Sequence, residues 1–346
     1  MTRAPFTIGD HSVAPGTRAT IELPVTVMSD HTPVNLSVHV IHGRKPGPTV
    51  FVSAAVHGDE VIGVEIVRRL LRSAKLDRLS GTLLAVPVVN TLGFLTHSRY
   101  LPDRRDLNRA FPGSSHGSLA ARLAHFFLTE VVSRADFGID LHSAAREREN
   151  LPQIRVTPGD GEGLRMAETF GAPVIVTSAL RPGSLREAAR QLGVPMLLFE
   201  GGEGLRFDEF SARSGVSGIL RVMRALGMIS ARGVSAPKVK PIRAMKSGWT
   251  RAPSSGLFRA FRQRGEVVGE GDVIGAVSDP FGEEEVDVTA AGGGIIIGRT
   301  NLPVVNEGDA LFHIAQLRRP DGAEAALESL TEQLEGDEMF DEDEIV

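Results

Sequence analysis

Two short strings of the sequence carry residue types that could hold a metal ion. The string HGDE at residues 57–60 sets His57 and Glu60 three positions apart, and DLHS at residues 140–143 adds His142. Two histidines and one glutamate with a fourth position open form a known ligand set of catalytic zinc. Each string alone is more often explained by a salt bridge, a helix cap or a hydrogen-bonded histidine, so the prediction depends on their being brought together.

Two further strings offer groups that bind carboxylates or move protons. Residues 99–113 read RYLPDRRDLNRAFPG, in which planar guanidinium and amide groups suit bidentate binding of a carboxylate. The string EGGEG at residues 200–204 follows a predicted buried strand, which makes Glu200 a candidate general base. Glu203 is its rival within the same string.

The composition limits the chemistry that these residues can perform. The chain of 346 residues has no cysteine, so any metal is held by histidines and carboxylates. The net charge of −5 gives no general basic field for nucleic acid. Eleven acidic residues lie after Pro320, and without them 38 basic residues face 32 acidic ones. The remaining body is therefore positively charged, which suits a substrate that carries carboxylates.

The elements that must position these strings follow from hydrophobic patterning. Residues 49–56 and 82–89 are almost continuously apolar, as in strands covered on both faces, and residues 61–74 between them have helical spacing. Predicted strands and helices continue to follow one another as far as residue 228. Two predicted antiparallel strands precede residue 49. We therefore predict an α/β fold over residues 1–230, with a mixed sheet and helices on both faces.

The rest of the chain differs in composition. Residues 231–242 are rich in Pro, Lys and Arg and are expected to be a linker. Residues 243–320 contain short β-type segments separated by glycines, which predicts a small β-barrel or sandwich domain. Residues 321–346 are so acidic that we expect a disordered tail, although residues 323–334 could form one helical turn or more.

The four strings, in this order, resemble those of the succinylglutamate desuccinylase/aspartoacylase family of zinc deacylases. The resemblance covers about residues 45–315 and implies the metallocarboxypeptidase fold, with a C-terminal β-rich domain that shapes the entrance to the site. It also implies that His57, Glu60 and His142 hold one Zn²⁺ per chain. Glu200 would accept a proton from the attacking water and pass it to the leaving amine.

The resemblance implies roles for four more residues of the site. Arg99 would polarise the scissile carbonyl, although Arg104 and Arg105 remain alternatives for that role. The other three are Asn108 and Arg109, which would bind a substrate carboxylate, and Asp106, which would orient His57 through its second ring nitrogen.

Two further residues bear on the assignment. Asp140 is the runner-up for the role of Asp106. Relatives also use a tyrosine late in the chain, whereas the single tyrosine here is Tyr100. Either another group takes its place or the substrate differs.

Together these observations predict a zinc-dependent deacylase that hydrolyses the amide bond of a small N-acyl amino acid or related N-acyl amine carrying a carboxylate. The alternatives are a carboxypeptidase-like metallopeptidase and, in another class, a non-catalytic metal-binding or ligand-binding interaction protein. We expect a cytoplasmic protein with no nucleic-acid or membrane partner, and an oligomer remains open. No apolar run reaches the length of a membrane span.

Overall fold

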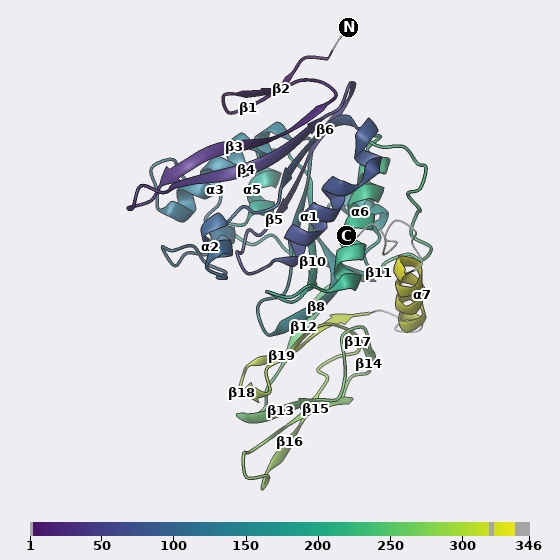
Figure 1. Cartoon of the computed structure of the whole chain (residues 1–346). Helices are drawn as coiled ribbons and strands as arrows, with labels where there is room; N and C mark the ends of the chain where they lie inside the picture. Colours follow the sequence, from purple (N-terminus) through teal and green to yellow (C-terminus); the bar gives the residue numbers. More distant parts are fainter. Residues whose placement is uncertain (1–2, 318–321, 336–346) are drawn as a thin grey trace.

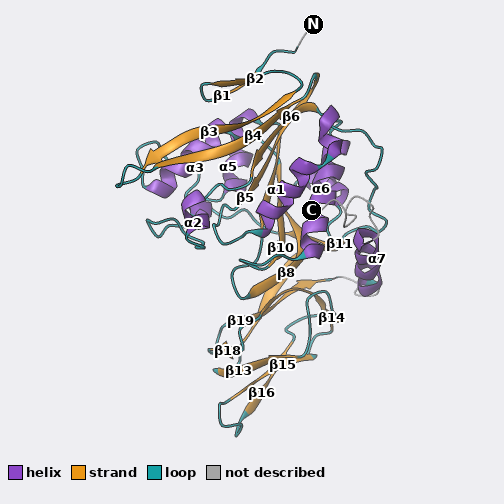
Figure 2. Cartoon of the chain, in the orientation of Figure 1, coloured by secondary structure: helices purple, strands orange, loops and turns teal. Residues whose placement is uncertain are grey.

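The computed structural model describes residues 3–317 and 322–335 (Figure 1). Its main feature is a 13-stranded mixed sheet whose principal strand order is β12-β19-β17-β8-β10-β7-β5-β6-β4-β3. A four-stranded antiparallel sheet, β16-β15-β13-β18, forms the end of the molecule away from helices α1–α6 (Figure 2). The predicted α/β fold with a β-rich C-terminal region is confirmed.

The strands are β1 Phe6–Ile8, β2 His11–Val13, β3 Thr17–Val27, β4 Pro33–His42, β5 Lys45–Ala54, β6 Ser80–Val86, β7 Phe137–His142, β8 Arg148–Val156, β9 Val174–Thr177, β10 Met196–Gly202, β11 Ile242–Ala244, β12 Lys246–Arg251, β13 Gly256–Ala260, β14 Val267–Val268, β15 Val273–Ser278, β16 Glu285–Thr289, β17 Gly294–Thr300, β18 Val304–Val305 and β19 Ala310–Gln316. The helices are α1 Ile62–Arg72, α2 Thr91–Leu95, α3 Leu119–Glu130, α4 Gly161–Phe170, α5 Leu185–Gln191, α6 Glu209–Ala225 and α7 Ala323–Glu335, with 3₁₀ turns η1 Ala74–Arg78, η2 Leu107–Arg109 and η3 Val132–Arg134.

Two apolar layers hold helices against the sheet. Along β5, Val50 and Val52 face the layer that contains α1, α4 and α6, while Phe51 between them faces the layer that contains α3 and α5. This alternation is the period of two expected of a strand. Because both faces are covered, the strand is buried throughout its apolar part, as the continuous apolar run predicted.

The C-terminal strands are not confined to a separate unit. Strand β17 pairs with β8, and β19 and β12 follow it, so the large sheet continues from the α/β region into the C-terminal one. The expected linker also ends in β11, which pairs with β9. The boundaries proposed from the sequence at residues 230, 242 and 320 therefore stay a prediction.

The expectation of a disordered tail from residue 321 is wrong for helix α7. Three of its apolar side chains, Ala323, Leu330 and Leu334, are buried, and the amide nitrogen of Gln333 donates to the carbonyl of Ala236. The helical alternative noted for residues 323–334 matches α7, whose apolar residues form one face at helical spacing. Residues 336–346 lie outside the described residues.

Within the described ranges, we find no helix with the length and apolar character needed to cross a bilayer.

Candidate active site

Strand pairing brings the predicted site residues to one edge of the sheet. Strands β5, β7 and β10 run parallel, so their carboxyl ends meet. Ala54 at the end of β5 lies opposite Leu141, and Glu200 of β10 lies opposite His142. Two strings that are about 85 residues apart in sequence therefore become neighbours, and Glu200 joins them.

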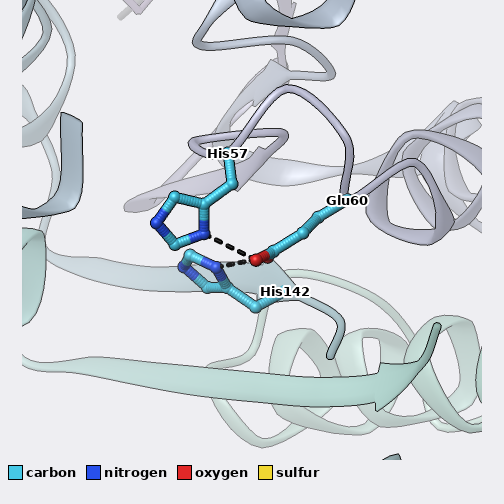
Figure 3. Close-up of side chains that lie close together, drawn as sticks. All are labelled: His57, Glu60 and His142. Atoms are coloured by element: carbon cyan, nitrogen blue, oxygen red, sulfur yellow. Dashed lines mark hydrogen bonds and ion pairs between the residues drawn. The ribbon is translucent and has the colours of Figure 1, made fainter. Parts of the chain in front are cut away.

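The three candidate ligands converge in the structure (Figure 3). The Nδ1 atom of His57 lies 2.6 Å from Oε1 of Glu60, and the Nδ1 atom of His142 lies 2.7 Å from Oε2 of the same carboxylate. One ligand atom from each residue falls within 4.8 Å of the others, and all three residues are buried. Two imidazole nitrogens and a carboxylate that face one point match the donor set of a zinc site.

Each histidine is held from behind by a carboxylate. The Nε2 atom of His57 lies 3.1 Å from Oδ1 of Asp106, the residue to which the family resemblance gives this position. The Nε2 atom of His142 lies 2.6 Å from Oδ2 of Asp140, so Asp140 orients His142 and not His57. Such carboxylates fix the orientation of the ring and raise the basicity of a metal-binding nitrogen. The Nδ1 atom of each ring is then free to face the point where a metal ion would bind.

The charges of the three candidate ligands shift one another's pKa values. Burial alone would raise the pKa of Glu60, but the charges of His57 and His142 outweigh it and hold that pKa far below its usual range. Burial would likewise lower the pKa of His142, yet Asp140 and Glu60 raise it well above the ordinary value. The Glu60 carboxylate therefore remains ionised, the form in which a carboxylate binds a metal ion.

The turn that carries the HGDE string can form only because residue 58 is glycine. A Cβ atom on Gly58 would lie 2.0 Å from the backbone carbon of Gly93 in α2. On the other side, a Cβ on Gly63 would come within 3.0 Å of Ala54 and Leu141, so α1 packs directly on β5 and β7. This close packing sets the position of Glu60 relative to His142.

Arg99 is the one of the three candidate arginines that lies at this group. Its guanidinium donates to Oε1 of Glu60 at 3.1 Å and to Oδ2 of Asp106 at 3.2 Å. Arg104 and Arg105 are exposed and do not line the cavity described below. The geometry therefore favours Arg99 over both alternatives. Tyr100 next to it is 48% exposed and also lies outside the cavity.

The two rival glutamates of the EGGEG string have different surroundings. Glu200 faces the cavity, where Asn150 donates to its Oε2 at 2.8 Å and Nε of Arg155 lies 3.0 Å from its Oε1. Glu203 accepts from the backbone nitrogen of Glu147 at 2.9 Å and from Asn301 at 3.0 Å. Glu203 thus connects a loop to the C-terminal region, whereas Glu200 lines the cavity.

Asn108 and Arg109 line the same cavity. The side-chain oxygen of Asn108 accepts from the backbone nitrogen of Leu185 at 2.9 Å, which directs its amide nitrogen elsewhere as a donor. The backbone nitrogen of Asn108 in turn donates to Asp106 at 2.8 Å. The DLNR string therefore links the carboxylate behind His57 to two groups suited to an anion.

The cavity has a volume of about 610 Å³, a size suited to a small molecule. Several of its lining residues were not singled out in the sequence: Arg148, Asn150, Arg155, Arg181, Arg186, Trp249 and His313. Three of these lie on β8, a strand that the sequence analysis did not recognise. Trp249 on β12 and His313 on β19 stack with 4.6 Å between ring centroids, so the C-terminal region forms part of the wall. The one sequence feature that could have drawn attention to this part of the wall is that Trp249 is the single tryptophan of the chain.

Comparison with known proteins agrees with this geometry. Residues 46–226, more than half of the chain, match the family model described as "Succinylglutamate desuccinylase/Aspartoacylase catalytic domain". The chain belongs to the succinylglutamate desuccinylase/aspartoacylase family. Two of its relatives are named as a deacetylase and a desuccinylase, that is, as enzymes that remove an acyl group.

One such relative is the N-alpha-acetyl-L-2,4-diaminobutyric acid deacetylase of Halomonas elongata, 28% identical over 287 residues, which cover 79% of this chain and 84% of that protein. A succinylglutamate desuccinylase of Burkholderia pseudomallei is 30% identical over 249 residues, or 65% of this chain and 64% of that protein. Among solved structures, the succinylglutamate desuccinylase/aspartoacylase from Rhodobacter sphaeroides superposes with a TM-score of 0.77 at 25% identity, covering 87% of this chain and 96% of that one. The family resemblance seen in the four strings is therefore confirmed.

Proposed function

We propose that this protein is a zinc-dependent deacylase that hydrolyses the amide bond of a small N-acyl amino acid or a related N-acyl amine. The observation that carries the proposal is the convergence of two Nδ1 atoms and the Glu60 carboxylate, each histidine being held by its own aspartate. A zinc ion held by His57, Glu60 and His142 would act as a Lewis acid and make a water molecule available as nucleophile near neutral pH.

Glu200 would act as the general base and then as the general acid. It reaches the cavity from β10, directly beside His142 in register, and its carboxylate is held in one orientation by Asn150 and Arg155. From there it would accept a proton from the attacking water and deliver it to the amine nitrogen as the C–N bond breaks.

Arg99, Asn108 and Arg109 would bind the substrate. The guanidinium of Arg99 is directed by two carboxylates and would donate to the amide oxygen, on which negative charge develops. The amide nitrogen of Asn108 and the guanidinium of Arg109 would bind a substrate carboxylate. A cavity of about 610 Å³ favours a small acyl compound over an extended peptide.

The test is a hydrolysis screen of N-acetyl, N-succinyl and N-formyl amino acids with zinc supplied, read out as free amine. We expect at least one of these compounds to be hydrolysed and activity to disappear after chelation. Glu200→Gln should lower kcat at least 100-fold while zinc content stays at one per chain. Glu203→Gln is the matched control and should retain kcat. Full activity after exhaustive chelation, or in Glu200→Gln, would refute the proposal.

A further inference from the structure

Two adjoining cavities lie at the end of the sheet opposite the candidate metal site. Their volumes are about 520 and 560 Å³, and Lys45, Asp77 and Arg78 line both. Lys45 is the first residue of β5, whose last residue, Ala54, precedes the turn that carries His57. A strand of this length spans about 30 Å. The two cavities are therefore separate from the active site.

The walls of these cavities are rich in positive charge. The cationic lining residues, which together with the two cavities are termed here the basic groove, are Arg18, Arg44, Lys45, Lys75, Arg78 and Arg232. Among the described residues that line the groove, Asp77 is the one carboxylate, and it accepts from Arg18 at 2.9 Å. The other five cations have no carboxylate at ion-pair distance within residues 3–317 and 322–335. The groove therefore attracts anions.

The floor of the basic groove is apolar. Ile41, Leu76 and Leu79 line one cavity, Met228 and Ile229 line the other, and all five are buried. The cations thus surround a surface that can also receive apolar side chains. A partner that fits both features combines several carboxylates with a few apolar residues.

The sequence contains a segment of this kind directly after helix α7. Residues 336–346 read GDEMFDEDEIV, with six carboxylates and no lysine or arginine. The same segment has four apolar side chains, Met339, Phe340, Ile345 and Val346. It therefore matches the basic groove in charge and in apolar content.

Helix α7 ends close enough for this segment to reach the groove. Arg213 of α6 donates to the carbonyl of Glu335, the last residue of α7, at 3.2 Å (Figure 1). From Arg213, α6 continues to Ala225 over about 18 Å, and Gly227 just beyond it lines the groove. Eleven extended residues span at most about 36 Å, so residues 336–346 are long enough to enter it.

We propose that residues 336–346 bind in the basic groove of the same chain, with their carboxylates at its cations and their apolar side chains on its floor. Single exposed ion pairs contribute little, so binding depends on many contacts made together and on covalent attachment. Attachment gives the segment an effective concentration of about 1 mM. If the free segment bound with a Kd of about 100 µM, its own chain would then occupy the groove about nine-tenths of the time.

A fluorescently labelled peptide of residues 336–346 tests the proposal by its anisotropy on binding. The wild-type chain is compared with a neutral-segment variant of the full chain, which carries Asp337→Asn, Glu338→Gln, Asp341→Asn, Glu342→Gln, Asp343→Asn and Glu344→Gln. We expect the peptide to bind the neutral-segment variant at least 10-fold more tightly than the wild-type chain, because the wild-type groove is already occupied. This binding should weaken as the salt concentration rises.

Charge reversal identifies the surface that binds the peptide. In the neutral-segment variant, Lys45→Glu together with Arg78→Glu should weaken peptide binding at least 10-fold, because repulsion replaces attraction. The matched control is Arg122→Glu together with Arg190→Glu, which makes the same change in net charge at exposed positions of α3 and α5. The control should bind the peptide as the neutral-segment variant does. No hydrolysis is measured, so the outcome is independent of the proposed function.

The proposal is overturned if the peptide binds the wild-type chain and the neutral-segment variant equally, if it binds neither, or if the groove variant binds it as tightly as the control does. A dimer of the wild-type chain in light scattering, absent from the neutral-segment variant, would show that the segment binds a second copy and not its own chain. A single-stranded oligonucleotide that binds the wild-type chain more tightly than the peptide binds the neutral-segment variant would assign the groove to nucleic acid instead.

Discussion

Asp140→Asn tests whether the carboxylate behind His142 tunes the metal site. Asp140 is fully buried, receives a hydrogen bond from Ser53 at 2.7 Å and lies 2.6 Å from Nε2 of His142. Asparagine keeps the volume of the side chain and can still accept one hydrogen bond. It removes the negative charge that raises the basicity of the His142 nitrogen that would bind the metal. Loss of such a partner typically lowers metal affinity 10- to 100-fold. This corresponds to about 1.4 to 2.7 kcal/mol of binding free energy.

The assay is a competition titration of zinc between the protein and a chromophoric chelator, with the melting temperature of the metal-free protein measured alongside. Asp136→Asn is the control, because Asp136 lies just before the opposite end of β7 and accepts from the backbone nitrogen of Thr49 at 2.7 Å. We expect zinc affinity to fall in Asp140→Asn and to stay unchanged in Asp136→Asn. Unchanged affinity in Asp140→Asn, or an equal loss in both variants, would refute the reasoning.

Three further predictions concern packing and pH. Gly58→Ala should abolish zinc binding, because the added methyl group would overlap the backbone of α2. Gly161→Ala is the control and should leave the metal content unchanged, because a Cβ atom there meets open space. Elemental analysis of the purified variants measures the metal content. His313 is held neutral because burial and two nearby guanidinium groups lower its pKa to about 3. The unfolded chain binds this proton below pH about 6.5, so the free energy of unfolding should fall as the pH is lowered from 6.5 to 3, by at most about 1.4 kcal/mol per pH unit. The fall should be less steep in His313→Phe. Equal dependence of the free energy of unfolding on pH in the two proteins, measured by urea unfolding, would contradict this. Leu334→Ala should lower the free energy of unfolding by about 2 kcal/mol, because Leu334 is buried. Glu328→Ala, on the exposed side of α7, should lower it by under 0.5 kcal/mol. Equal losses of unfolding free energy in the two variants would show that α7 does not pack as described.

The convergence of the three candidate metal ligands could be predicted because their strings end buried strands. Patterning alone indicated that β5 and β7 are covered on both faces, and parallel strands place their carboxyl ends together. The partner of Asp140 was also within reach of the sequence, since residues two apart on a strand share a face and Asp140 is two before His142. Its assignment to His57 overlooked that periodicity.

The rest of the cavity wall could not be predicted because it depends on pairing between distant segments. Arg155 reaches Glu200 only because β8 pairs antiparallel with β10, and β8 itself is interrupted by polar residues that hide its strand pattern. Nothing in the local sequence distinguishes Arg186 from the other charged residues of helix α5. Trp249 and His313 enter the site through pairing of β12 with β19, which no local string announces.

The continuous sheet also bears on how this scaffold could acquire new substrates. Main-chain hydrogen bonds run from β10 through β8, β17 and β19 to β12, so the wall that contains Trp249 is attached to the catalytic strands by a ladder and not by a flexible joint. Swinging that wall aside would break the ladder, and exchanging the C-terminal region as a module would damage the site. Point substitutions on β12 and β19 can instead reshape the cavity without altering a candidate metal ligand. Directed evolution of substrate range in this chain should therefore begin on those two strands.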